Sequence, residues 1–367
     1  MKNKNVIFCY EGCGQRACQF TYHNYINTCG FSGTCAVTLE IARKLCENGN
    51  NVIITGVCDK KNETSEFDSR LKYMERPSNE DLYNCDLFVF SWQMAWPYGR
   101  ELLARLGPKT IVCGFSHMFW SGHDIVCVRD IVKSFGLKFV YIVNSKLSKL
   151  KFAAFDTDIP YIHVNNSISS DVFKLEKSYD VSKKKDASIF PTTYNKGGYY
   201  SEKITKMCGK EFVHNTYLDG NTSVSLGKKQ LKKMMYETDY FIYCQCFEGC
   251  GDYWADTYCN AIHEALACGV LVVTYDVGCL RGVYGDNLVF IDPPDYSGFE
   301  RLNGTVSGGG HNPLMTSDEY INKFVEKIKY LDSNPSIKNN IRKKAQEWAL
   351  SNTYDLEYEN FIKIFNI

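Results

Sequence analysis

The chain has 367 residues, a length that suggests two domains. Its 42 basic and 42 acidic residues cancel, which argues against a nucleic-acid binder that relies on a general positive field. The 17 cysteines are odd in number, and a chain of this length does not need disulfide staples. We therefore expect a reduced, intracellular protein, without a signal peptide or a membrane-spanning run of ~18 apolar residues.

The N-terminal half alternates short apolar runs with helical patterns. Predicted strands lie at residues 5–10, 51–56, 86–91, 110–114, 139–143 and 161–164. Residues 34–48 are a predicted helix, and Gly49 fits its end. Continuous apolar runs separated by helices indicate a parallel sheet that is covered on both faces.

A lysine-rich stretch at residues 174–186 is the predicted linker, after which the alternation resumes. Predicted strands lie at 187–190, 212–214, 240–244, 271–275 and 288–291, and predicted helices at 228–236, 257–268, 318–331 and 335–350. Two successive parallel α/β domains place ligands in a cleft at the carboxyl ends of their strands. The cysteine clusters around Cys9 and Cys244 lack zinc-site spacing, so no metal site is predicted.

An acid pair, Asp256 and Glu264, is the most informative motif of the chain. The eight residues from one acid to the other rise ~12 Å along a helix, a span that suits a diphosphate with a sugar on each side. Asp256 could instead be a helix N-cap. If it begins the helix, the backbone N–H groups of Tyr258, Cys259 and Asn260 point out of the helix start, where an anionic donor would gain from them.

Glu264 is either a solvated helical carboxylate or a ligand contact. Its helix is apolar nearly all round and joins two apolar strands, so we expect it to be buried. A buried carboxylate needs partners, and a ribose diol would supply two hydroxyl donors.

The segment from Asp256 to Val273 resembles the C-terminal domain of retaining glycosyltransferases of the GT-B fold, specifically glycosyltransferase family 4. The family shows two glutamates separated by seven residues, then a small-residue helix end, a glycine and a strand; here Asp256 replaces the first glutamate, and Glu248 is a possible substitute. The resemblance implies an α/β fold of two Rossmann-like domains that face a cleft. The predicted domains are 1–173 for the acceptor and 187–351 for the nucleotide sugar, with 352–367 crossing back.

The resemblance also implies further donor contacts. Lys196 matches a lysine that contacts the donor diphosphate, and Thr193 stands near where the family often has an arginine. Gly30 and Gly33 match a glycine-rich loop, and His117 matches an active-site histidine, with His123 as its rival. Lys196 could instead be a surface lysine, Gly30 and Gly33 could form a plain turn, and His117 could be a histidine stacked among aromatic residues.

The sequence therefore predicts a cytoplasmic, metal-independent, retaining glycosyltransferase. Its expected catalytic residues are His117 and Asp256, with no cofactor. A UDP-sugar or GDP-sugar would be the donor, and a glycan or glycoconjugate would be the acceptor. No nucleic acid is expected as a partner, and membrane contact would be at most weak and peripheral. The alternatives are a nucleotide-sugar epimerase on the same fold and a degenerate, non-catalytic binder.

Overall fold

The computed structural model describes residues 3–10, 21–27, 33–56, 63–65, 67–90, 96–115, 122–145, 158–174, 185–189, 198–213, 216–219, 222–244, 258–276, 279–292 and 318–367. The chain divides into two compact units: a first unit of residues 1–169 and 353–367, and a second unit of residues 170–352. The lysine-rich stretch that was predicted as a linker thus falls inside the second unit. Only Lys174, Lys185 and Asp186 of that stretch are described.

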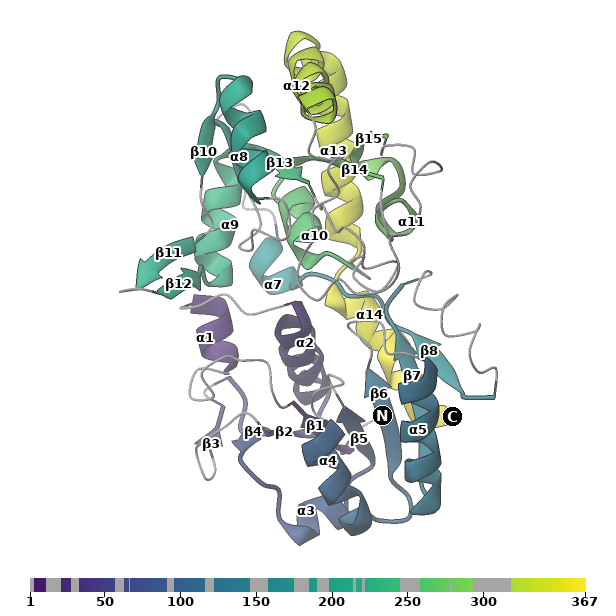
Figure 1. The fold of residues 1–367 in the computed structure, drawn as a ribbon. Helices are drawn as coiled ribbons and strands as arrows, with labels where there is room; N and C mark the ends of the chain where they lie inside the picture. Colours follow the sequence, from purple (N-terminus) through teal and green to yellow (C-terminus); the bar gives the residue numbers. More distant parts are fainter. Residues whose placement is uncertain are drawn as a thin grey trace. The chain divides into compact units, whose positions relative to one another are not determined.

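The first unit is a sheet with helices on its faces (Figure 1). Its strands are β1 (Asn5–Cys9), β2 (Asn51–Thr55), β3 (Glu63–Thr64), β4 (Leu71–Met74), β5 (Leu87–Phe90), β6 (Ile111–Phe115), β7 (Lys138–Val143) and β8 (Tyr161–His163). Its helices are α1 (Tyr22–Asn27), α2 (Gly33–Glu47), α3 (Asn79–Tyr83), α4 (Trp96–Leu102), η3 (Leu103–Arg105), α5 (Gly122–Ser134), α14 (Tyr354–Phe361) and η8 (Ile362–Asn366).

The strand order of this sheet is β3-β4-β2-β1-β5-β6-β7-β8. All neighbours pair in parallel except β3 with β4. The chain runs outward from β1 through β2 and β4, then returns to the other side of β1 with β5, as in a doubly wound sheet. The C-terminal segment joins this unit, because Glu357 accepts hydrogen bonds from the backbone N–H and the side chain of Asn165, at 2.9 and 3.1 Å.

The second unit is a smaller parallel sheet with the order β10-β9-β13-β14-β15. Its strands are β9 (Lys185–Ile189), β10 (Glu211–Val213), β13 (Thr238–Tyr243), β14 (Leu271–Tyr275) and β15 (Val289–Ile291), and an antiparallel hairpin of β11 (Thr216–Asp219) and β12 (Thr222–Ser225) stands apart. Its helices are α7 (Ser170–Phe173), α8 (Gly198–Met207), α9 (Lys228–Tyr236), α10 (Asn260–Ala267), α11 (Leu280–Tyr284), η7 (Gly285–Asn287), α12 (Asp318–Ser333) and α13 (Pro335–Ser351).

The central strands β13 and β14 explain why this unit folds as it does. Every residue of both strands is buried, as expected for strands that are covered on both faces. One face packs on α12, where Phe324 lies edge-on against Tyr275 with ring centroids 4.8 Å apart. The cysteines serve mainly as small core residues, because nine of the eleven that are described are buried.

Most predicted strands are present within a residue or two. Strands β3 and β4, the β11–β12 hairpin and several helices, among them α5 and α8, are not among the predicted elements. α5 and α8 each mix apolar with polar and charged residues, whereas the buried strands are continuous apolar runs that stand out in the sequence.

Candidate functional site

The carboxyl ends of β9 and β13 mark the point where the second sheet reverses its strand order. From β9 the chain moves outward to β10 and then returns to β13 on the other side, from which it continues to β14 and β15. In open α/β sheets, ligands bind at the carboxyl edge at such a switch point. α10 follows β13 at this edge, so its first turn is the place to look for a site.

α10 begins at Asn260, three residues later than predicted. Cys259 is its N-cap residue, and the Cys259 carbonyl accepts hydrogen bonds from Ile262 N and His263 N at 3.0 and 3.4 Å. The alternative interpretation of Asp256 as the N-cap is therefore wrong, because Cys259, with φ −105° and ψ 96°, takes that place. Cys259 has no side-chain capping hydrogen bond. Because α10 begins at Asn260, the N–H groups of Tyr258 and Cys259, which were predicted to lie at the helix start, precede its first turn.

The end of α10 is set by Gly269, as the sequence suggests. Gly269 has φ +67°, the left-handed conformation that glycine adopts most readily. Its N–H donates to Leu266 O at 2.8 Å, and Val270 N donates to Ala265 O at 2.9 Å. This pair of bonds is a Schellman motif, which ends the helix and directs the chain into β14.

Glu264 is buried in the middle of α10, with 4% of its side chain exposed. Its Oε1 accepts a hydrogen bond from Nζ of Lys228, the first residue of α9, whose side chain is 7% exposed. The predicted burial of Glu264 is thus confirmed, and the structure adds an ionic partner to it. Breaking a buried pair of this kind typically costs about 3–5 kcal/mol, because one charge is left uncompensated.

Lys228 is not among the site residues predicted from the sequence, although its position in the apolar pattern of α9 marks it. Lys228, Leu231, Lys232 and Met235 are the buried residues of α9 and follow the i, i+3, i+4, i+7 spacing of one helical face. A lysine at a core position of an amphipathic helix needs a buried acceptor or anion. Of the acid pair Asp256 and Glu264, only Glu264 was expected to be buried, so it was the natural partner for such a lysine.

Asn260 lies one turn before Glu264 and on the same face of α10, because residues four apart are neighbours on a helix. It is 8% exposed, and neither its Oδ1 nor its Nδ2 has a hydrogen-bond partner among the described residues. Buried side-chain amides are nearly always satisfied in native proteins. The start of α10 therefore combines a buried carboxylate, a buried cation and a buried, unsatisfied amide.

The residues before α10 are held by His263, which is fully buried. The Ala349 carbonyl can only accept, so the Nε2–H of His263 donates to it, at 3.0 Å. Nδ1 is then the acceptor for the Tyr258 hydroxyl, at 2.8 Å. Burial lowers the pKa of His263 to about 4, so the imidazole is neutral at neutral pH and keeps this tautomer.

An aromatic cluster completes this support. The Tyr284 hydroxyl donates to the Cys259 carbonyl at 2.7 Å, so the N-cap residue is anchored from α11. Trp348 of α13 lies against His263 and Tyr284, with ring centroids 5.0 and 5.4 Å apart. Tyr258 and Cys259 are thereby held by His263 of α10 and Tyr284 of α11, and α13 packs against those two residues.

The structure brings together four of the predicted site residues: Tyr258, Cys259, Asn260 and Glu264. In the first unit, Gly33 is the first residue of α2 and is exposed. Two residues later the Cys35 thiol lies 2.8 Å from the Tyr10 hydroxyl at the end of β1. The remaining predicted site residues, His117, Asp256, Gly30, Thr193 and Lys196, lie outside the described residues, as does the side chain of His123.

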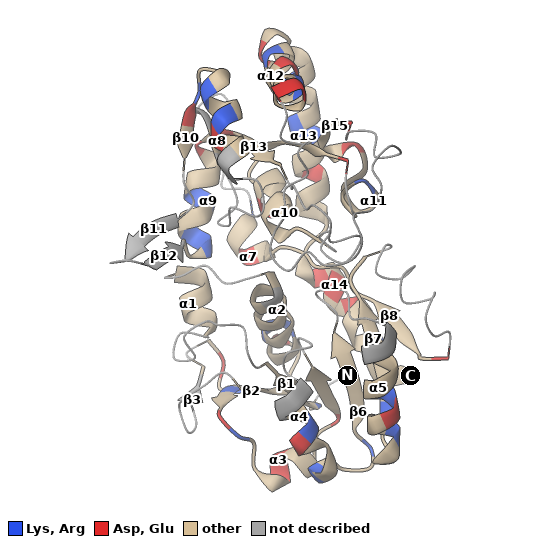
Figure 2. Cartoon of the chain, viewed as in Figure 1, with Lys and Arg blue, Asp and Glu red and all other residues tan. Residues whose placement is uncertain are grey.

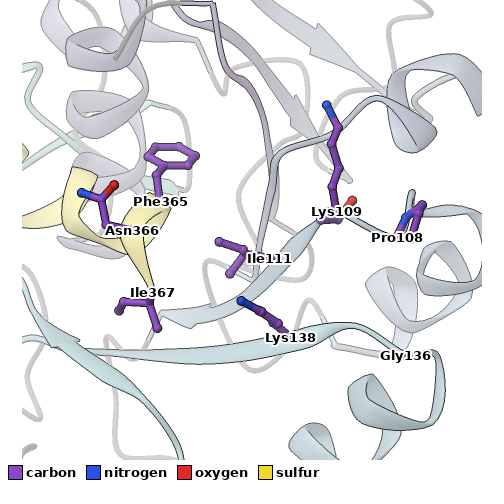
Figure 3. Close-up of a pocket in the computed structure, with 9 residues that line it drawn as sticks. Pro108, Lys109, Ile111, Gly136, Lys138, Phe365, Asn366 and Ile367 are labelled. Carbon is purple, nitrogen blue, oxygen red and sulfur yellow. The ribbon is translucent and has the colours of Figure 1, made fainter.

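A pocket of about 490 Å³ lies elsewhere in the first unit (Figure 3). Its lining includes Lys109 and Ile111 at the start of β6, Lys138 at the start of β7, and Phe365 and Ile367 near the C-terminus. These strand positions belong to the amino edge of the sheet, opposite the edge at which parallel sheets bind ligands. Lys109 forms an ion pair with Asp86 at 3.2 Å. We assign no function to this pocket.

Charges of both signs are distributed over the outer helices, as on α12 in Figure 2. α9 differs, because it carries four lysines and no acidic residue.

Over the described ranges, no group of three His, Cys, Asp or Glu side chains is placed to bind a metal ion. In the same part of the chain, no helix combines the length and the hydrophobicity that crossing a membrane requires.

No protein-family model matches the chain, and no curated protein matches it. Solved structures do match, over nearly its whole length. Sucrose-phosphate synthase from Thermosynechococcus elongatus has a TM-score of 0.68 at 9% identity and covers 99% of this chain and 98% of its own. Anabaena HepE, solved with UDP-glucose, has a TM-score of 0.62 at 11% identity, with 98% and 99% covered. An α-glucosyltransferase, solved with UDP and a 13-mer DNA, has a TM-score of 0.57 at 13% identity, with all of both chains covered.

At these identities the likeness shows the fold alone. The predicted fold class, an α/β protein with the two Rossmann-like domains of GT-B glycosyltransferases, is confirmed. One of these structures contains DNA. The exclusion of nucleic acid as a partner therefore remains an expectation from the net charge.

Proposed function

We propose that the chain is a glycosyltransferase that moves a sugar from a nucleoside-diphosphate sugar to a hydroxyl of a glycan or glycoconjugate. The observation that carries this proposal is the buried Lys228–Glu264 pair behind the first turn of α10, at the carboxyl edge of β13. A carboxylate held there is suited to accept hydrogen bonds from the ribose diol of a nucleotide. The fold shared with UDP-sugar-bound HepE supports this interpretation.

The diphosphate would lie toward the start of α10. The N–H groups of Asn260 and Ala261 belong to the first turn, whose amides have no intrahelical carbonyl to bind, and the helix dipole there favours negative charge. By the family resemblance, Lys196 and Thr193 would contact the same diphosphate, and the loop of Gly30 and Gly33 would let the donor approach the backbone.

The transferred sugar would meet Asp256 and His117 in this proposal. The reaction breaks the bond between the anomeric carbon and the diphosphate oxygen and forms one to the acceptor oxygen. Charge develops on the departing diphosphate, so preorganised amides and the Lys196 ammonium would stabilise the transition state electrostatically. This electrostatic role needs no metal ion. We propose retention of anomeric configuration, as in the family that the motif resembles, and a cytoplasmic location.

A transfer assay with the full chain tests the proposal. UDP-sugars and GDP-sugars would be incubated with a panel of glycan acceptors, with and without EDTA, and the products followed by NMR, which also reports the anomeric configuration. We expect acceptor-dependent release of nucleotide that persists in EDTA and is strongly reduced in Glu264→Gln. Conversion of donor without acceptor would indicate an epimerase, and tight nucleotide binding without any transfer would indicate a non-catalytic binder.

A further inference from the structure

The Asn260 side chain is a buried amide whose two polar atoms have no partner among the described residues. It is more than nine-tenths buried and begins α10, whose N-cap residue makes no side-chain capping hydrogen bond. A buried amide that the protein leaves unsatisfied destabilises the fold. Its presence at the carboxyl edge of β13 is explained if a ligand supplies the missing partners.

The neighbours of Asn260 define which chemistry such a ligand needs. Glu264 lies one turn further along the same face, with Cβ atoms typically about 5–6 Å apart at this spacing. Side chains of an α-helix lean toward its N-terminus, so the Glu264 carboxylate leans toward Asn260. Lys228 occupies Oε1 of that carboxylate. The amide and the carboxylate are therefore near enough to bind one small group together.

The two unsatisfied atoms of Asn260 distinguish between ligand groups. A phosphate oxygen only accepts hydrogen bonds, so it would satisfy Nδ2 and leave Oδ1 unsatisfied. A hydroxyl both donates and accepts. With a pair of neighbouring hydroxyls, Nδ2–H donates to the oxygen of one hydroxyl while Oδ1 accepts from the other. The carboxylate of Glu264, which only accepts, takes the remaining hydroxyl proton.

We infer that Asn260 is a specificity-determining residue that reads the ribose diol jointly with Glu264 and so selects ribonucleotides over deoxyribonucleotides. This inference rests on the proposed function, because it places the ribose of a nucleotide donor at Glu264. The diphosphate would then lie beyond the first turn, on the side of the free helix amides.

Calorimetric titration of the full chain with UDP, 2′-deoxy-UDP and 3′-deoxy-UDP tests this inference, and the GDP series repeats the test for the other base. We expect the wild type to bind UDP more tightly than at least one deoxy analogue by about threefold to tenfold, the range for one or two hydrogen bonds. In Asn260→Leu that preference should fall, because only the hydrogen bond to Glu264 then distinguishes the hydroxyls. Asn260→Asp, which keeps the size but removes the N–H donor, should lower it as well. Asn166→Leu is the matched control, since Asn166 in the first unit is also buried with an unsatisfied Oδ1, and it should keep the preference.

Thermal unfolding of the same variants distinguishes ligand recognition by Asn260 from a structural role of this residue. Because no described residue bonds to either polar atom of Asn260, Asn260→Leu should unfold at the same temperature as the wild type or at a higher one. A lower melting temperature together with an unchanged preference for UDP would overturn the inference and assign Asn260 to the fold. An unchanged preference in both variants, with UDP still bound, would overturn the inference alone. Failure of the wild type to bind any of these nucleotides would overturn the proposed function with it.

Discussion

Lys228 begins α9, and its ammonium donates a hydrogen bond to the Glu264 carboxylate in the middle of α10. The two residues are 36 positions apart in the chain, and β13 lies between them in sequence. The pair thus links α9, which precedes β13 in the chain, to α10, which follows β13, close to the carboxyl edge of that strand.

Removing one member of this pair should destabilise the second unit strongly. We expect Lys228→Met to lower the free energy of unfolding by about 3–5 kcal/mol, because the buried Glu264 carboxylate loses its cation, and Glu264→Leu to lower it too, because the buried Lys228 ammonium loses this carboxylate. The double variant should lose less than the sum of the two. Urea denaturation at pH 7 measures all three. The exposed pair of Lys206 and Glu202 is the control, since Lys206→Met should cost at most about 0.5 kcal/mol. Strict additivity of the two single losses would contradict an energetic coupling between Lys228 and Glu264.

Asp256→Asn should reduce the rate of sugar transfer while the protein stays folded. The N-cap of α10 is Cys259, so the substitution leaves that cap residue unchanged. The melting temperature should therefore stay within about a degree of the wild type, while kcat falls. A clear drop in melting temperature with unchanged kcat would assign Asp256 to the fold instead of the donor sugar.

Lys196→Ala should weaken UDP much more than uridine. The ammonium is proposed to contact the diphosphate, and a charge-assisted hydrogen bond contributes about 1.5–3 kcal/mol. Calorimetry with UDP and with uridine measures the two losses separately, and uridine serves as the internal control. Equal losses for both ligands would rule out a diphosphate contact.

His263 should make the protein less stable in mild acid. Its pKa is about 4 in the folded state and about 6.5 when unfolded, so below pH 6.5 the unfolded chain binds the extra proton. The stabilisation is complete above about pH 6.5 and is lost as the pH falls toward 4. Between pH 7.5 and pH 5 this residue should account for a loss of about 2 kcal/mol. Urea unfolding of the wild type and of His263→Gln at both pH values isolates this contribution, because the variant lacks the titrating group. Parallel pH profiles for the two proteins would show that His263 is not neutral and buried in solution.

Gly269→Ala should destabilise the end of α10. Gly269 adopts φ +67°, and a side chain there costs about 1–2 kcal/mol. Gly282→Ala in α11 is the control, because a methyl group there meets nothing within 4 Å and its φ is not positive. Thermal unfolding should show a loss for the first variant and no loss, or a gain of about 0.5 kcal/mol, for the second. Equal effects of the two substitutions would contradict the role of the left-handed conformation.

Most strands of the two parallel sheets and the end of α10 could be predicted because their signals are local. β13 and β14 are continuous apolar runs, and Gly269 follows a small-residue helix end. The start of α10 could not be predicted, since Asp256 is as good a capping residue as any in that segment. Its place is taken by Cys259, which a hydrogen bond from the Tyr284 hydroxyl holds in position. The neighbouring Tyr258 is held by the hydrogen bond that its hydroxyl donates to His263.

The sequence by itself determined the class of fold and the segment in which to look for a site, because apolar periodicity and the acid–acid–glycine spacing are properties of neighbouring residues. Only the tertiary structure decided that Glu264 is paired with Lys228 and that Asn260 is buried with no hydrogen-bond partner for its side chain in the described part of the chain. Both facts depend on how α9 and α10 pack around the sheet. Burial in that packing determines what an ionised or amide side chain needs as a partner, and this packing is not encoded in any single stretch of the chain.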